Sequence, residues 1–279
     1  MRTSVASILL AGLAFTAAGA PAATATNVPA SLMPAALAPV LQGGLRVIKS
    51  FPAASGLTGW VLQSQEDGEY NVFFTTADGQ SVMAGALVSA AGVNLTKQYV
   101  DQYVPPPDWS LTWRKLESSA VVVSGTLKNP KSVIYVLMDP NCSYCHLLWK
   151  ALRPYEAAGL QVRWVPVGIL REDSLGKAAA LLQGGDAALA QSQISFDVRA
   201  ESAAIDPIPL TPELKAKIAA NTTLMQESKV SGTPGIFFKD ASGAVQRHNG
   251  MLYTKDLPAL LGLPEQAQTD PELARFKGN

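Results

Sequence analysis

One stretch, residues 132–146, constrains the fold more than any other part of the sequence. It opens at residues 133–137 with an apolar run rich in β-branched side chains, which predicts a fully buried strand. The Asp-Pro-Asn sequence at 139–141 then favours a turn. From Cys142 onward, apolar residues recur with helical spacing until Pro154, which is expected to kink or end the helix. The pattern predicts a strand that passes through a turn directly into a helix.

The only two cysteines of the chain, Cys142 and Cys145, form one C-x-x-C motif at the start of this predicted helix. Unpaired backbone N–H groups and the helix dipole favour an anion there, so the Cys142 thiol is expected to lose its proton easily. Cys145 lies one turn further on, within reach of a disulfide with Cys142. A bond across two residues restrains the unfolded chain very little. We therefore interpret the pair as a dithiol redox site rather than a structural disulfide.

The composition fits a globular protein of about two domains. The chain has 279 residues, of which 48% are hydrophobic and 16% charged, so it can bury a sizeable core. The 22 basic residues balance the 22 acidic ones, and no cluster of lysine or arginine stands out. Electrostatics therefore give no reason to expect nucleic acid as a partner.

Residues 1–25 have the pattern of a secretory signal peptide. Arg2 supplies a positive start, residues 5–15 form an apolar core, and small residues follow at 18–22. The apolar core is shorter than the ~20 residues that a membrane-spanning helix needs, which argues against a retained anchor. We expect a cleaved signal peptide and an exported, soluble mature protein.

Residues 26–104 are expected to form a small α+β domain built on an antiparallel meander. Turn signals such as Glu-Asp-Gly at 66–68 separate the strand patterns. The predicted strands are 45–51, 60–65, 70–76 and 81–88. A helix at 94–104 follows and stops at a run of prolines. Residues 105–125 are then expected to contain a linker helix that Asp108 caps.

Residues 126–265 are expected to form the redox domain. A second buried strand at 160–169 follows the C-x-x-C helix, and this spacing predicts a parallel βαβ unit. Residues 173–229 read as a helical insertion interrupted by prolines. The elements expected after it are a strand at 230–239 that contains Gly-Thr-Pro, its hairpin partner at 244–248, and a closing helix at 255–263. Residues 266–279 read as a polar, frayed C-terminal tail.

This order of elements resembles the thioredoxin fold, and the sequence is similar to the periplasmic DsbC/DsbG group of disulfide isomerases, in particular to its DsbG-like members. The likeness covers nearly the whole mature chain. The residues that carry it are Asp139-Pro140, Cys142, Tyr144-Cys145, Trp149, Arg153-Pro154, Val167-Gly168-Ile169 and Thr233-Pro234. DsbC-type members generally carry an extra cysteine pair, which is absent here. Ser143 stands where DsbG-like proteins usually have proline, and His146 where lysine is common, so the redox potential need not transfer.

The resemblance implies an α/β, thioredoxin-like redox domain with a helical insertion, preceded by an N-terminal dimerisation domain and a linker helix. It implies a thiol–disulfide oxidoreductase of the periplasm that needs no cofactor or metal. Its partners would be exported proteins with oxidised or mispaired cysteines, a DsbD-type reductase of the inner membrane, and a second copy of the chain.

The site residues expected from the motif and the resemblance fall into three groups. Cys142 is the attacking thiolate, and Cys145 resolves the mixed disulfide. Substrate contacts are expected from Tyr144, Thr233 and Pro234, with Pro234 in the cis form and facing the C-x-x-C. Ser143 and His146 are expected to modulate the thiols. His146 is interpreted as an exposed helix residue that helps the thiolate when it is protonated.

Other functions fit parts of the same pattern. The client reaction could be reduction of sulfenic acids or DsbC-like reshuffling of disulfides, and a chaperone-like holder of unfolded chains is a further alternative. Residues 142–146 also match the C-x-x-C-H of covalent haem attachment, but a buried strand that leads into the motif argues against it. A zinc site would need four ligands, and the usual soft donors offer only Cys142, Cys145, His146 and His248.

Overall fold

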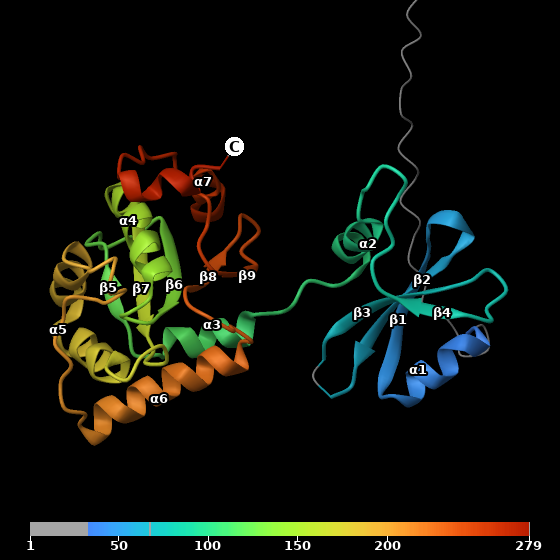
Figure 1. Cartoon of the computed structure of the whole chain (residues 1–279), viewed down its shortest axis with the longest axis horizontal. Coiled ribbons are helices and arrows are strands. Elements are labelled where there is room, and N and C mark those ends of the chain that lie inside the picture. The colour runs from blue at the N-terminus through green and yellow to red at the C-terminus, as the bar shows by residue number, and fades with distance from the viewer. Residues whose placement is uncertain (1–32, 67, 279) are drawn as a thin grey trace, which may run out of the picture. The chain divides into compact units, whose positions relative to one another are not determined.

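The computed structural model describes residues 33–66 and 68–278, so the expected signal peptide at 1–25 lies outside the described residues. The chain divides into two compact units, one that ends at Pro106 and one that begins at Pro107 (Figure 1). The division falls within the run of three prolines at residues 105–107. None of the helices described is both long and apolar enough to cross a membrane.

The N-terminal unit contains the predicted meander. Its four strands form an antiparallel sheet in the order β1-β2-β3-β4. The elements are α1 (Ala38–Gln42), β1 (Leu45–Pro52), β2 (Thr58–Ser64), β3 (Tyr70–Thr75), β4 (Val82–Ala84) and α2 (Leu95–Tyr103). β4 is shorter than predicted because Gly85 follows it at φ 135°, a backbone angle outside the extended region.

Both faces of this small sheet are covered. Side chains alternate along β2, so Val61 points to one face while Trp60 and Leu62 point to the other. On the first face α2 supplies Tyr103, whose ring stacks on Phe51 with centroids 4.1 Å apart. The short helix α1 and the turn before it cover the second face. Among the described residues, no further strand pairs with the two edges of the sheet, β1 and β4.

The second unit is built on a five-stranded sheet in the order β5-β7-β6-β8-β9. β6 lies at its centre, parallel to β7 and antiparallel to β8, which confirms the predicted βαβ unit. The strands are β5 (Val122–Ser124), β6 (Ser132–Met138), β7 (Leu160–Pro166), β8 (Gly235–Lys239) and β9 (Val245–Asn249).

The helices of this unit are α3 (Ser110–Glu117), α4 (Ser143–Ala158), α5 (Ser174–Ile194), α6 (Pro212–Glu227) and α7 (Leu257–Leu261). α5 and α6 form the predicted helical insertion. α5 is broken at Gly185, whose φ of 63° and ψ of −153° interrupt the helix. α4 continues through Pro154 and ends before Gly159, at φ 119°, so the proline does not end it.

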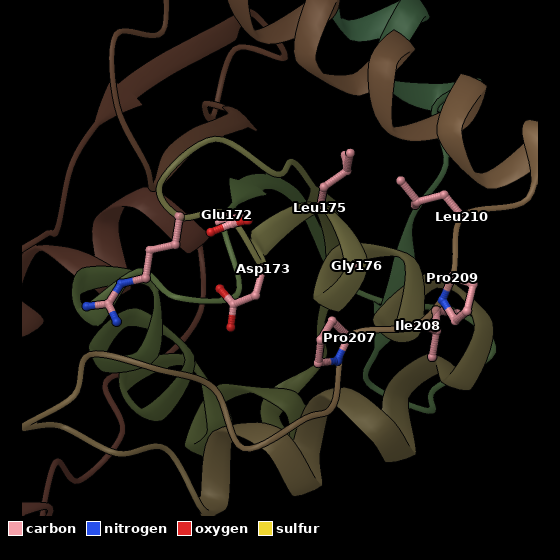
Figure 2. Close-up of a pocket in the computed structure, with 9 residues that line it drawn as sticks. Glu172, Asp173, Leu175, Gly176, Pro207, Ile208, Pro209 and Leu210 are labelled. Carbon is pink, nitrogen blue, oxygen red and sulfur yellow. The ribbon is translucent and has the colours of Figure 1, made fainter.

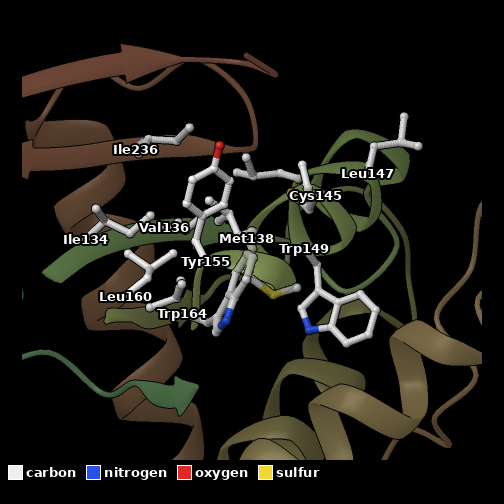
Figure 3. Close-up of a cluster of buried hydrophobic side chains, with 14 of the residues drawn as sticks. Ile134, Val136, Met138, Cys145, Leu147, Trp149, Tyr155, Leu160, Trp164 and Ile236 are labelled. Carbon is white, nitrogen blue, oxygen red and sulfur yellow. The ribbon is translucent and has the colours of Figure 1, made fainter. Parts of the chain in front are cut away.

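The sheet buries a core on each face. One core lies between the sheet and α4, and Trp164, Tyr155, Met138 and Cys145 all belong to it (Figure 3). The other core is covered by α6 and by α3, whose Trp113 meets Tyr135 edge to face at 5.0 Å. The helix expected in the linker therefore packs on the redox sheet.

The N-cap residue of α3 is not the predicted Asp108. The N-cap position belongs to Trp109, while the Asp108 carboxylate accepts the backbone N–H of Ser110 at 2.9 Å. Asp108 thus satisfies one of the free amides of the first turn from one residue further out.

The C-terminal residues do not form a frayed tail. Pro271–Phe276 is a 3₁₀ helix, and Leu273 within it is 1% exposed and belongs to the core that contains Cys145. Composition suggested fraying because the segment is mostly polar. One buried leucine and several polar contacts to α4, described below, hold it in place.

Candidate active site

The turn between β6 and α4 is organised by the buried carboxylate of Asp139. Its Oδ1 accepts the N–H of Asn141 at 2.9 Å, and its Oδ2 accepts the N–H groups of Ile169 and Leu170 at 2.7 and 3.0 Å. Ile169 and Leu170 follow β7, the parallel neighbour of β6. Because parallel strands end at the same edge of a sheet, one carboxylate can join both turns there.

A buried polar cluster fixes Asn141, the residue before Cys142. Its Nδ2 donates to Asp173 Oδ1 at 2.8 Å and to Ser174 Oγ at 2.9 Å, while its Oδ1 accepts from Lys177 Nζ at 3.0 Å. Lys177 Nζ also donates to Ser202 Oγ at 2.6 Å and pairs with Asp173 at 2.9 Å. We call these five residues the Lys177 clamp. It ties the redox turn to the helical insertion.

The two thiols meet at the start of α4. Cys142 is the N-cap residue, and its Sγ accepts the backbone N–H of Cys145 at 3.1 Å. Both cysteines are free thiols, 5% and 1% exposed respectively. The sulfur of Cys142 therefore occupies the position where a helix favours negative charge.

The two thiols are shifted in opposite directions. The pKa of Cys142 is lowered, chiefly by a hydrogen bond from the Cys145 side chain and further by Thr233 and the backbone of Cys145, against its burial and the nearby Asp139. The pKa of Cys145 is raised well above the usual value for cysteine, first by burial and then by its interaction with Cys142. Hydrogen bonds outweigh burial at Cys142, so its pKa falls. Burial dominates at Cys145, so its pKa rises.

The cis-proline loop completes the site. Gly235 pairs with Leu137 at the end of β6, so the preceding Thr233–Pro234 bond lies beside the redox turn, and this bond is cis as expected. The Cys142 thiol donates to the carbonyl oxygen of Thr233 at 3.3 Å. The structure thus brings together Cys142, Cys145, Thr233 and Pro234 from segments far apart in the sequence.

The two residues between the cysteines face different environments. Tyr144 is 51% exposed, and its ring meets Phe276 edge to face at 6.2 Å. Ser143 is half-buried, and its hydroxyl oxygen is enclosed with no hydrogen-bond partner among the residues described. Of the two residues between the cysteines, Tyr144 is therefore the exposed one.

The expectation that His146 is an exposed helix residue is wrong. It is 3% exposed, its ring stacks on Phe196 at 4.4 Å, and Nδ1 and Nε2 lie 3.2 and 3.3 Å from oxygens of Gln193 and Glu272. Burial lowers its pKa below the usual value for histidine, so the ring is neutral at neutral pH. His146 thus brings no positive charge to the thiolate, and both of its nitrogens face partners inside the fold.

A groove of about 740 Å³ lies beside this site (Figure 2). Residues 171–173, 175 and 176 line it on one side and residues 207–210 on the other, and neither cysteine contributes to it. Its connection to the site is Asp173, which also belongs to the Lys177 clamp. The chemistry is therefore not located in the groove. In the described part of the chain, no three His, Cys, Asp or Glu side chains are arranged to hold a metal ion.

Sequence reasoning did not identify Asp139, Asn141 and Lys177 as site residues, although the first two were recognised as turn formers. The one local signal for Lys177 is its spacing of four residues from Asp173, which is common on helix surfaces. Only the packing of the insertion against the turn shows that this lysine is buried.

The opposite pKa shifts predict different titrations for the single variants. In Cys142→Ala, the pKa of the remaining Cys145 should stay above the usual cysteine range because its burial persists, but lie below that in the wild type, where Cys142 also raises it. In Cys145→Ser, the hydroxyl can still donate to Cys142, whose pKa should stay low. Cys145→Ala removes the largest stabilising contact, so Cys142 should titrate higher than in Cys145→Ser. Thiolate absorbance against pH measures all three. A lower pKa for Cys145 alone than for Cys142 alone would reverse the assignment.

The Lys177 clamp predicts a large cost for removing its amine. Lys177→Met leaves Asn141 Oδ1 without its charged donor, so the free energy of unfolding should fall by about 2–3 kcal/mol. Lys217→Met is a matched control, because Lys217 also pairs with an acid one turn away but is 48% exposed against 6% for Lys177. It should cost less than about 0.5 kcal/mol. Equal costs in urea unfolding would show that the clamp does not hold the turn.

Comparisons with known proteins agree with this site. Residues 122–263 match the family of thioredoxin-like domains. The thiol:disulfide interchange protein DsbG of Pseudomonas aeruginosa is 33% identical over 257 residues, which cover 91% of this chain and 97% of the relative. The Escherichia coli protein of the same name is 26% identical, with 82% and 92% covered.

The match to a DsbC protein covers less of this chain than the matches to the two DsbG proteins do. The thiol:disulfide interchange protein DsbC of Dickeya dadantii is 26% identical over 177 residues, which cover 62% of this chain and 67% of the relative. The match to DsbG of Pseudomonas aeruginosa, by contrast, includes both units of the chain. The chain belongs to the DsbG-type thiol:disulfide interchange proteins, thioredoxin-like enzymes whose redox pair here is Cys142 and Cys145.

Proposed function

We propose that this protein reduces sulfenylated or wrongly disulfide-bonded cysteines of exported proteins in the periplasm. The observation that carries the proposal is the asymmetry of the pair: one thiol has a lowered pKa beside the cis-proline loop, and the other is buried with a raised pKa. A thiol with a low pKa is the better nucleophile for the client sulfur, and a buried thiol can then resolve the mixed disulfide.

With a client disulfide, the Cys142 thiolate attacks one client sulfur and expels the other as a thiolate. The product is a mixed disulfide between Cys142 and the client. Cys145 then attacks the Cys142 sulfur, which releases the client cysteine and forms the Cys142–Cys145 disulfide. Two electrons pass from the dithiol to the client. If a client cysteine other than the one just expelled attacks the mixed disulfide first, a new client disulfide forms and Cys142 leaves as a thiolate, which regenerates the dithiol and is isomerase activity.

With a sulfenic acid the first step differs only in the leaving group. The Cys142 thiolate attacks the client sulfur, and the oxygen leaves as water after taking up a proton. Resolution by Cys145 then returns a free client thiol, as above. The high pKa of Cys145 keeps it protonated while Cys142 is a thiolate. Once Cys142 is bonded to the client, its hydrogen bond and charge no longer raise the pKa of Cys145, and only burial remains.

Client contacts are assigned to Tyr144, Thr233 and Pro234. Tyr144 supports this role by its exposure, and the cis-proline loop by its position next to the Cys142 sulfur. Ser143 and His146 would modulate the pair through packing, since His146 is buried and neutral. A reductase at work in an oxidising compartment needs an electron supply, so we assign a DsbD-type donor in the inner membrane. The signal-like residues 1–25 support export.

A client with a single oxidised cysteine tests the reaction directly. Reduced protein should return the thiol of a client sulfenic acid and form one Cys142–Cys145 disulfide for each thiol returned. Cys145→Ser should stop at the mixed disulfide, and Cys142→Ala should do nothing. Thiol trapping in cells should find the wild-type pair mainly reduced. A pair found mainly oxidised would indicate an oxidase, and clients protected equally by Cys142→Ala would indicate a chaperone-like holder.

The N-terminal unit is proposed to form a homodimer. Its sheet has four short strands whose faces α1 and α2 already cover, so its open edges at β1 and β4 are the surfaces that need a partner. Identical edges can pair about a two-fold axis and satisfy each other's backbone groups.

Light scattering of the full-length mature protein at micromolar concentration should give the mass of a dimer, since two edges would be paired. Deletion of the residues before Pro105 should give a monomer. A monomeric full-length protein would contradict the assignment and leave this unit without a role in assembly.

A further inference from the structure

The C-terminal segment, residues 268–276, is fastened along the redox helix α4. Lys150 of α4 pairs with Asp270 at 3.0 Å and with Glu272 at 2.9 Å. The side-chain amide of Gln268 donates to the carbonyl oxygen of Ala151 at 3.0 Å. Glu272 also faces His146, so the segment covers the residue that directly follows the motif.

The far end of the segment is fixed as well. Leu273 is buried in the core shared with both cysteines. The Thr254 hydroxyl donates to the carbonyl oxygen of Phe276 at 3.3 Å, so the backbone that carries this ring is held. The Phe276 side chain is therefore placed by the fold rather than left at the end of a loose tail.

The Phe276 ring contacts the segment between the two cysteines. Its ring meets Tyr144, the exposed residue between the cysteines, edge to face at an interplanar angle of 84°. The Arg275 guanidinium lies 5.0 Å from the centroid of the Phe276 ring. Tyr144, which lies between the two cysteines in the sequence, and Phe276 thus form one pair of contacting rings, and Tyr144 is 51% exposed.

We propose that Phe276 and Tyr144 together form a subsite that selects clients with an aromatic or large apolar side chain beside the reacting cysteine. The inference rests on the proposed function, because it takes the occupant to be the client segment that Cys142 attacks. Continuity with the dithiol supports this occupant, since Tyr144 lies between the two cysteines. Aromatic rings prefer an aromatic or apolar neighbour with edge or offset contacts.

The test compares two peptides that differ in one residue. Each carries one cysteine disulfide-bonded to glutathione, with Phe beside the cysteine in one and Ser in the other. Stopped-flow rates of glutathione release by the reduced, full-length protein give a selectivity ratio, Phe peptide over Ser peptide. We expect a ratio of about three to ten, the range that one aromatic contact provides, and a fall towards one in Phe276→Ala.

Three further variants make the result specific. Tyr144→Ala should lower the ratio to a similar extent, and the double variant should lower it no further than the larger single effect, because both rings form one subsite. Phe276→Leu should give an intermediate ratio and serves if Phe276→Ala proves unstable. Leu111→Ala removes an apolar side chain of α3 that is about as exposed as Tyr144, 57% against 51%, and should leave the ratio unchanged.

A ratio in Phe276→Ala equal to that of the wild type would overturn the subsite, as would additive losses in the double variant. Failure of the proposed function looks different. In that case the wild-type protein would release glutathione from neither peptide through Cys142.

Discussion

The hydrogen bonds that converge on the Cys142 sulfur govern how this protein works. The N–H of Cys145 and the Cys145 thiol both stabilise the thiolate, and the side chain of Thr233 lowers the pKa of Cys142 further. These contacts outweigh the burial of the sulfur and the proximity of Asp139, both of which disfavour negative charge. The same arrangement keeps Cys145 protonated, since its own burial dominates. One geometry thus gives the two thiols opposite pKa shifts.

The rest of the second unit serves to hold that geometry. Asp139 joins the turns after β6 and β7, and the Lys177 clamp fastens Asn141 to the helical insertion. The register of β8 on β6 brings Thr233 and Pro234 to the sulfur. The insertion therefore stabilises the turn from which the redox helix starts, in addition to covering the sheet.

Local patterns were enough to predict the strand, turn and C-x-x-C helix, because strand and helix periodicities and turn residues act over a few neighbours. The βαβ unit and the meander followed from the same signals. His146 and residues 266–279 could not be interpreted in this way. His146 is buried by Phe196 and Glu272, which lie far away in the sequence, and the polar C-terminal segment is held by Leu273 and by Lys150. Both depend on tertiary contacts that composition does not encode.

Site-resolved alkylation tests the central claim most directly. The claim is that hydrogen bonds lower the pKa of Cys142 while burial raises that of Cys145. The reduced protein is treated briefly with iodoacetamide over a range of pH, and mass spectrometry locates the label. The account predicts that Cys142 reacts first, at a pH below the usual range for cysteine, and that Cys145 stays unlabelled under the same conditions. Labelling of both cysteines with the same pH dependence, or of Cys145 first, would contradict it.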